Sequence, residues 1–295
     1  MRTYIGDTFA DSYQTALNDV LSNPQYKASP RGMEIREVTN AALVIRDPEC
    51  CLYENSRRSS QLKYIAAELL WYFSGRNDAE FISRFAKFWQ SIKNDDGTVN
   101  SAYGNLIFNE DNVHSYNQWK WAYESLYNDK DTRQAIMHFN KPEHQFKDNK
   151  DFVCTIYGIF HIRNDELNFT VHMRSNDLIL GTPTDIAFFC LLQQQMYRLL
   201  KKRYKSLKIG RYTHIVDSLH IYERHFDLVG DMVNSRFDPM TYPELDIDLV
   251  DEAGNCNTEV LNLLKNVEAA SEFNPDSKIG ITSSFIDWLN DRIYE

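Results

Sequence analysis

The fold is decided by residues 151–177, whose sequence is DFVCTIYGIFHIRNDELNFTVHMRSND. Residues 151–162 and 167–174 carry β-branched and aromatic side chains, and the turn-forming residues 163–166 separate them, so we predict a hairpin of two long strands. Along the second strand, apolar and polar residues alternate: Leu167, Phe169, Val171 and Met173 against Asn168, Thr170, His172 and Arg174. Arg174 is therefore predicted to lie on the polar face.

Chemically useful side chains gather around this hairpin. Cys154 lies near the start of the first strand, Arg174 and Ser175 follow the second, and Asp185 comes shortly afterwards. A thiolate is a strong nucleophile, and a guanidinium binds phosphate through two parallel hydrogen bonds. A core cysteine and a surface arginine are the ordinary interpretations of such residues taken singly. Only their combination indicates a site.

The flanking sequence predicts further elements. Apolar residues at helical spacing and suitable end signals indicate helices over 8–22, 60–73, 184–204 and near 119–127 and 285–293. Strands are predicted over 34–47 and 209–222, the latter leading into a helix. Thr184 is predicted to cap its helix, with Asp185 in the first turn. Beyond 234 the chain is acidic with short strand-like pieces. Since no linker or repeat divides it, residues 1–295 are interpreted as a single α/β domain.

Composition excludes several classes of protein. The chain has 295 residues, 43% of them hydrophobic, and a formal charge of −10. This supports a sizeable core and argues against a basic nucleic-acid groove, but a few arginines in a pocket still suit a small anion. We expect no membrane span and no secretion signal. Five irregularly spaced cysteines indicate reduced thiols, no metal site and a cytoplasmic location.

Seven short segments, in this order and spacing, resemble the thymidylate synthase family between about Arg31 and His225. They are Pro30-Arg31-Gly32, Ala67-Glu68-Leu69-Leu70-Trp71, Ala102-Tyr103-Gly104, Asp131-Thr132-Arg133, Phe152-Val153-Cys154, Arg174-Ser175-Asn176-Asp177 and Ser218-Leu219-His220-Ile221-Tyr222. Residues 234–295 match poorly. Within the family, the chain most resembles the deoxycytidylate 5-hydroxymethylases of T-even bacteriophages. Those enzymes share Cys154-Thr155 and the run 173–177, and they place Asp, as at Asp185, where thymidylate synthases place Asn.

The resemblance implies a fold and an assembly. The family fold is of the α/β (α+β) class, with a large mixed, twisted sheet packed against helices, and the sheet forms the interface of a homodimer. Arg133 matches a residue that reaches the phosphate in the partner's site. Gln134 stands where the family usually has a second arginine, which implies a weaker phosphate contact there.

The resemblance also implies roles for single residues. Cys154 matches the nucleophile, Glu68 a residue that moves protons, and Asp185 the residue that reads the base. The remaining matches bind the substrate's phosphate (Arg31, Arg133, Arg174 and Ser175), the sugar hydroxyl (His220 and Tyr222), or the folate and the wall of the active site (Trp89, Tyr103 and Asp177). The competing interpretations are a solvated helix edge for Glu68 and a favourable helix start for Asp185.

The implied reaction transfers a one-carbon unit from 5,10-methylenetetrahydrofolate to carbon 5 of deoxycytidylate (dCMP), with hydration, giving 5-hydroxymethyl-dCMP. A modified-DNA pathway of this kind suggests a phage source and a location in the host cytoplasm. Three alternatives stay open: a methylating enzyme, either a thymidylate synthase or a dCMP methylase; a hydroxymethylase acting on dUMP or CMP; and a nucleotide-binding paralogue without catalysis. Retention of Cys154, Glu68 and the arginines speaks against the last.

Overall fold

The computed structural model describes residues 1–273 and 277–295. The chain divides into two compact units. The first unit comprises Met1–Ser60, Cys154–Gln194 and Ser206–Tyr242, and the second comprises Gln61–Val153, Gln195–Lys205 and Pro243–Glu295. Each unit draws on three separate segments, so no single point along the chain separates them. The interpretation of residues 1–295 as a single catalytic domain stays a prediction.

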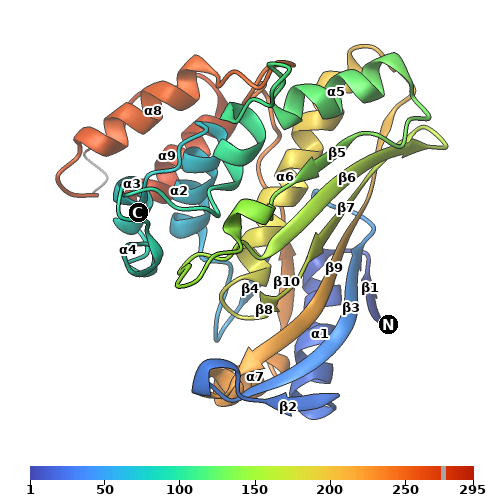
Figure 1. Cartoon of the computed structure of the whole chain (residues 1–295), viewed down its shortest axis with the longest axis vertical. Helices are drawn as coiled ribbons and strands as arrows, with labels where there is room; N and C mark the ends of the chain where they lie inside the picture. Colours follow the sequence, from blue (N-terminus) through green and yellow to red (C-terminus); the bar gives the residue numbers. More distant parts are fainter. Residues whose placement is uncertain (274–276) are drawn as a thin grey trace. The chain divides into compact units, whose positions relative to one another are not determined.

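The first unit is built on a mixed sheet (Figure 1). Its strands are β1 (Arg2–Gly6), β2 (Tyr26–Ala28), β3 (Ile35–Ile45), β6 (Thr155–Arg163), β7 (Glu166–Met173), β8 (Asn176–Asp177) and β9 (Lys208–Tyr222). They lie in the order β1-β3-β9-β7-β6, with β2 beside β3 and β8 beside β9. The β1–β3, β7–β9 and β8–β9 pairs are parallel and the others antiparallel. The predicted hairpin is confirmed as β6 and β7.

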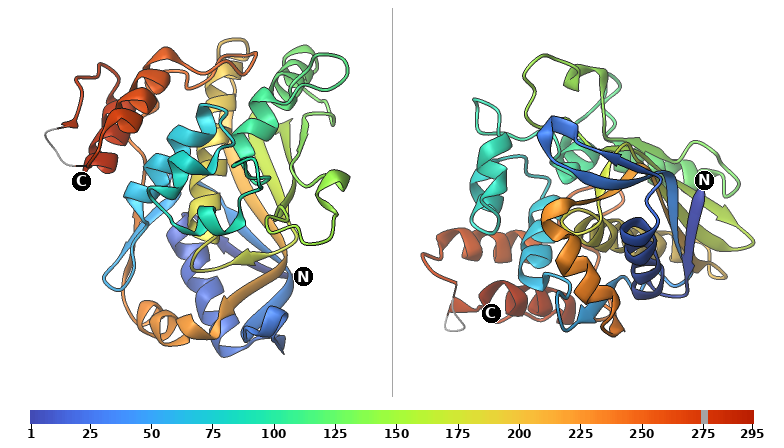
Figure 2. Two further views of the ribbon diagram at one scale, coloured as in Figure 1. Left: turned by 60° about the vertical axis from the view of Figure 1, so that its left-hand side comes forward. Right: turned by 90° about the horizontal axis from the view of Figure 1, so that it is seen from below.

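Helices cover this sheet. In α1 (Phe9–Ser22), Thr8 and Asp11 form a capping box, and the buried residues Phe9, Tyr13 and Leu17 face the core. Figure 2 shows α1 (dark blue) beside α7 (Phe226–Val233, orange). In α6 (Thr182–Lys201), Gln193 donates to backbone carbonyls of Leu167 and Gly210. The unit also contains η1 (Pro30–Gly32), η4 (Glu223–His225) and the antiparallel pair β4 (Leu52–Asn55) and β10 (Phe237–Met240). The predicted mixed sheet packed against helices is thus confirmed.

The second unit is mostly helical. Its elements are α2 (Leu62–Phe73), α3 (Ala79–Ser83), α4 (Phe88–Ile92), η2 (Asn105–Asn109), α5 (Gln118–Asn128), β5 (Ile136–His138), η3 (Pro142–His144), α8 (Thr258–Ala269) and α9 (Ser284–Tyr294). Helix α2 contacts both α8 and α9. Position 104 must be glycine, because a Cβ there would lie 1.8 Å from the carbonyl oxygen of Tyr72.

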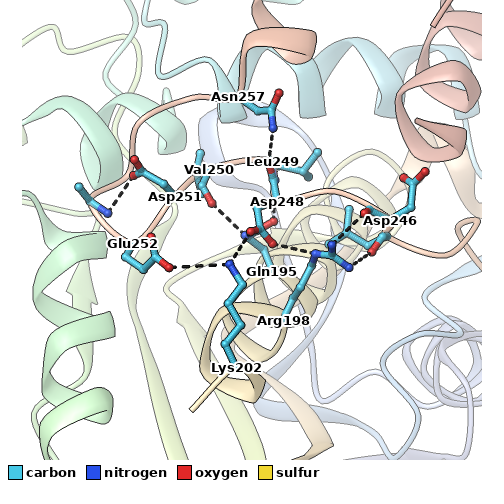
Figure 3. A network of polar contacts seen from close by, with 12 residues as sticks. Gln195, Arg198, Lys202, Asp246, Asp248, Leu249, Val250, Asp251, Glu252 and Asn257 are labelled. Atoms are coloured by element: carbon cyan, nitrogen blue, oxygen red, sulfur yellow. Dashed lines mark hydrogen bonds and ion pairs between the residues drawn. The ribbon is translucent and has the colours of Figure 1, made fainter. Parts of the chain in front are cut away.

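A polar network fixes residues 243–257 within the second unit (Figure 3). Arg198 donates to the Asp248 carboxylate and to the carbonyls of Leu245 and Asp246. Gln195 donates to the Val250 carbonyl and accepts from the Leu249 amide. Because this segment lacks regular structure, such side chains take over hydrogen bonds that a helix or strand would otherwise supply.

Two expectations for the fold need correction, and one strand was missed. The residues 258–269 form helix α8, because Val260, Leu263, Leu264 and Val267 share one buried face. Strand β1 at the amino terminus was not predicted. Thr184 does not cap α6: it lies inside the helix, and its hydroxyl donates to the Gly181 carbonyl at 3.0 Å. None of the helices in the described part of the chain has the length and apolar character that a transmembrane segment needs.

Candidate functional site

Cys154 and Arg174 lie side by side in the first unit, at the open end of the β6–β7 hairpin. The Arg174 amide donates to the Cys154 carbonyl at 2.9 Å, which holds the two residues together across the strands. The Arg174 guanidinium Nη2 lies 3.4 Å from Cys154 Sγ. A cationic donor beside a sulfur favours its thiolate form. Cys154 is half-buried.

Asp185 occupies the first turn of α6, as predicted. Asn176 Nδ2 donates to its Oδ2 at 2.7 Å. Part of the residue's surface is accessible, but the carboxyl group is densely surrounded by protein atoms, and this burial raises its pKa from 3.8 to about 7. The folded protein therefore holds this proton more tightly than the unfolded chain. The resulting contribution to the free energy of unfolding is full below about pH 4 and is lost as the pH rises through about 7.

The β8–β9 pairing brings further predicted residues together. Asp177 lies opposite His220, and the Leu178 amide donates to the His220 carbonyl at 2.9 Å. The rings of His220 and Tyr222 meet edge to face, with 5.0 Å between their centroids. Asp177 Oδ1 accepts from the Ile179 amide at 2.8 Å, so one of its oxygens is used to close the turn before α6.

Two predicted phosphate ligands have less local support. Arg31 is exposed in the short turn η1, with a left-handed backbone at φ 53°. Such a backbone is uncommon for a residue other than glycine, and where it occurs the surrounding structure must hold it. Ser175 is partly exposed between Arg174 and Asn176.

Glu68 lies in the second unit, on α2, and is 6% exposed. Tyr64, one turn earlier, donates its hydroxyl to Glu68 Oε1 at 2.6 Å, and Trp89 Nε1 donates to that hydroxyl at 3.0 Å. The interpretation of Glu68 as the solvated edge of a helix is therefore wrong. A buried carboxylate joined to a hydroxyl is chemically able to exchange protons, and the role of Glu68 stays a prediction.

The other two predicted residues of the second unit differ in exposure. Tyr103 is buried and stacks on Tyr72, with ring centroids 5.4 Å apart. Arg133 is exposed, as is Gln134 beside it. An exposed arginine has the accessibility that a contact with another subunit requires, and the role of Arg133 in a dimer stays a prediction.

Sequence reasoning missed His214, which contacts Asn176, and Tyr212, which contacts His214. His214 Nε2 lies 3.2 Å from Asn176 Oδ1, and the Tyr212 hydroxyl lies 2.8 Å from His214 Nδ1. Tyr212, His214 and Val216 are fully buried at alternate positions of β9. A histidine on the buried face of a strand was the available signal, because a buried polar group needs a partner.

Comparison with known proteins now identifies the family. The family model described as thymidylate synthase matches residues 11–274. The chain belongs to the thymidylate synthase family. It is 31% identical to a deoxycytidylate 5-hydroxymethyltransferase of Enterobacteria phage T2 over 73% of this chain and 87% of that protein. It is 28% identical to a deoxyuridylate hydroxymethyltransferase of Bacillus phage SP01, over 75% of this chain and 59% of that protein.

The fold agrees with this membership. The structure of a thermostable thymidylate synthase A from Bacillus subtilis superimposes with a TM-score of 0.66, covering 83% of this chain and 91% of that one at 20% identity. The chain is thus an enzyme of the thymidylate synthase family, and its reaction is one-carbon transfer of the thymidylate synthase type. The described residues contain no group of three His, Cys, Asp or Glu arranged to hold a metal ion.

Proposed function

We propose that this enzyme transfers a one-carbon unit from 5,10-methylenetetrahydrofolate to carbon 5 of dCMP and adds water, releasing 5-hydroxymethyl-dCMP and tetrahydrofolate. The observation that carries the proposal is the acid at position 185. It lies at the start of α6, where its side chain is hydrogen-bonded among the described residues through Oδ2 alone, in the same unit as the Cys154–Arg174 pair. Phage relatives named as deoxycytidylate and deoxyuridylate hydroxymethyltransferases support the hydration step.

Cys154 is the nucleophile of the proposed reaction. Carbon 5 of a pyrimidine becomes nucleophilic only when a group adds to carbon 6, and a thiolate adds there and leaves again readily. Carbon 5 then takes up the one-carbon unit, loses its proton and, when tetrahydrofolate departs, carries an exocyclic methylene. Water adds to the methylene, and the bond between sulfur and carbon 6 breaks. Arg174 favours the thiolate form of Cys154 both before the sulfur adds to carbon 6 and after it leaves.

Asp185 distinguishes cytosine from uracil in the proposed complex. Cytosine presents an amine at carbon 4 and an unprotonated ring nitrogen 3, so a protonated carboxyl can donate to the nitrogen and accept from the amine. With uracil the same carboxyl meets a carbonyl oxygen and an N–H group. The raised pKa of Asp185, about 7, supports this pairing, because the carboxyl then keeps the required proton to a much higher pH than an ordinary aspartate does.

The residues of the second unit suit a planar, hydrogen-bonding co-substrate. Trp89 packs edge to face on Trp71, with 5.3 Å between ring centroids, and its N–H is linked through Tyr64 to Glu68. Aromatic walls beside a proton-exchanging carboxylate fit a pterin ring. The folate supplies the one-carbon unit as an electrophile. Trp89, Tyr103 and Asp177 are proposed to bind it, and Glu68 to move protons during the reaction.

The remaining assignments follow the family positions. Arg31, Arg174 and Ser175 are proposed to bind the phosphate, and His220 and Tyr222 the sugar hydroxyl. A homodimer is proposed in which Arg133 contacts the partner's substrate. A thymidylate synthase or dCMP methylase is the second candidate function, favoured by the fold shared with the Bacillus subtilis enzyme.

Mass spectrometry of the product tests the proposal directly. The enzyme is incubated with dCMP and methylenetetrahydrofolate, and absorbance records dihydrofolate at the same time. We expect a nucleotide heavier than 5-methyl-dCMP by one oxygen atom, without dihydrofolate. A methyl product accompanied by dihydrofolate contradicts the hydration step, and turnover of dUMP or CMP in preference to dCMP contradicts the proposed substrate.

The pH dependence of dCMP binding provides a further prediction. One proton lies between Asp185 and ring nitrogen 3 in the proposed complex, whereas above the pKa of about 7 the free carboxyl has lost it. Binding should therefore take up a proton above pH 7, and kcat/KM for dCMP should fall about tenfold per pH unit there. Calorimetry in buffers of different ionisation enthalpy measures the uptake. An Asp185→Asn variant is the control, because it has no such proton; equal uptake in both proteins contradicts the assignment.

A further inference from the structure

Behind Asp185 lies a line of buried polar side chains that the sequence did not reveal. The Tyr212 hydroxyl and His214 Nδ1 are 2.8 Å apart, and His214 Nε2 is 3.2 Å from Asn176 Oδ1. The Thr182 hydroxyl also donates to Asn176 Oδ1, at 2.5 Å. Asn176 Nδ2 in turn donates to Asp185 Oδ2. All of these residues belong to the first unit.

The direction of the hydrogen bonds in this line follows from the orientation of the Asn176 amide, whose Nδ2 faces Asp185 and whose Oδ1 faces His214. Burial lowers the pKa of His214 to about 3, so the ring is neutral and carries a single N–H. An amide oxygen only accepts, so that N–H must be at Nε2, facing Asn176. Nδ1 then accepts from the Tyr212 hydroxyl. The line therefore donates from Tyr212 to His214, from His214 to Asn176, and from Asn176 to Asp185.

The same contacts hold the Asn176 amide in place. Turning it over would require three changes together: the Thr182 hydroxyl would have to donate to the Asp177 carbonyl alone, the His214 ring would have to move its N–H to Nδ1, and Asp185 Oδ2 would have to carry the proton. Asn176 is only 5% exposed, so water cannot readily take the place of these partners. In the fixed orientation, Asp185 Oδ2 is always an acceptor. The proton of the acid therefore belongs on Oδ1, which has no hydrogen-bond partner among the described residues.

The backbone leaves room for this arrangement. A Cβ at Gly181 would lie 2.7 Å from Asn176 Nδ2 and 3.4 Å from Asp185 Oδ2. Any larger residue would press on the hydrogen bond that joins the line to the acid. The turn before α6 is thus shaped around the Asn176–Asp185 pair.

We propose that Tyr212, His214 and Asn176 are positioning residues that orient the Asp185 carboxyl and thereby set which base the enzyme accepts. The inference rests on the proposed function. In an oriented acid, Oδ1–H donates to ring nitrogen 3 of cytosine while Oδ2 accepts from the amine. An acid free to rotate, or to move its proton to Oδ2, would lose this distinction between cytosine and uracil.

Substitutions of His214 test the proposal through the binding of the two nucleotides. The readout is the ratio of Kd values for dUMP and dCMP, measured by calorimetry without folate. His214→Leu removes the donor to Asn176 and should lower this ratio about a hundredfold, as displaced catalytic groups do. His214→Gln should restore most of it, because its amide N–H can occupy the place of Nε2–H. A purely structural role would change both Kd values equally, and an unchanged ratio in His214→Leu overturns the proposal.

Two further proteins complete the design. Tyr212→Phe removes a single hydroxyl and decides the question if His214→Leu does not fold: a severalfold fall in the ratio supports the line, and the parental ratio overturns it. His172→Leu is the matched control, because His172 pairs with Asp217 and does not contact Asn176. The proposed function fails separately, if the parent enzyme binds both nucleotides equally or makes no hydroxymethyl product.

Discussion

A Cys154→Ser enzyme should lose roughly 10⁴-fold in kcat for dCMP while its thermal stability stays close to that of the parent. A serine hydroxyl has nearly the same shape as a thiol but is far less ionised, and the guanidinium of Arg174 at 3.4 Å cannot compensate for that difference. The binding of dCMP should change little, since binding does not require the covalent bond. The exchange of tritium from carbon 5 measures the step directly, because it needs the addition of sulfur to carbon 6.

Cys256→Ser is the matched control for this experiment. Cys256 is also half-buried, but it lies in the second unit before α8, where its thiol donates to the Asn257 carbonyl. Its activity should equal that of the parent. Tritium exchange in Cys154→Ser at the parental rate would show that another group is the nucleophile.

The second large effect is expected at Asp185. An Asp185→Asn enzyme should lose about 10²- to 10⁴-fold in kcat/KM for dCMP and gain affinity for dUMP. An amide offers one donor and one acceptor that match uracil, but it cannot supply a proton to ring nitrogen 3 of cytosine. The variant also removes the raised pKa, so its free energy of unfolding should no longer fall between about pH 4 and pH 7.

Steady-state kinetics with both nucleotides measures this change. The control is Asp217→Asn, because Asp217 pairs with His172 on the partly exposed face of β9 and should leave base preference unaltered. If Asp185→Asn keeps the parental preference for dCMP, the carboxyl does not read the base.

Local sequence patterns predicted much of the fold. The alternation that ends at Arg174 located β7, and helical spacing located α2 and α9. Helix α8 was missed because its acidic surroundings obscured an apolar stripe, Val260 to Val267, that was present. Strand β1 is short, and its parallel pairing with β3 is a contact that no local pattern indicates.

The candidate site also contains residues that the sequence predicted and residues that it did not. Cys154, Arg174 and Asp185 were predicted because their residue types and motif order carry the chemistry. The residues that support Asp185 were not predicted, because His214 and Asn176 are 38 positions apart in the sequence and meet only through a side-chain contact in the folded chain. The partner of Glu68, Tyr64, lies one helical turn away and was within reach of sequence reasoning, but a tyrosine at that spacing is common on helices.

Covalent capture of a substrate analogue tests the central claim most directly. With methylenetetrahydrofolate and 5-fluoro-dCMP, carbon 5 cannot lose a proton, so the reaction should stop with the nucleotide, the one-carbon unit and folate attached to the enzyme. Mass spectrometry of peptides should place this adduct on Cys154, and 5-fluoro-dUMP should form it far more slowly. An adduct on a different residue, or faster capture of 5-fluoro-dUMP than of 5-fluoro-dCMP, would contradict a thiol acting on a cytosine that Asp185 has selected.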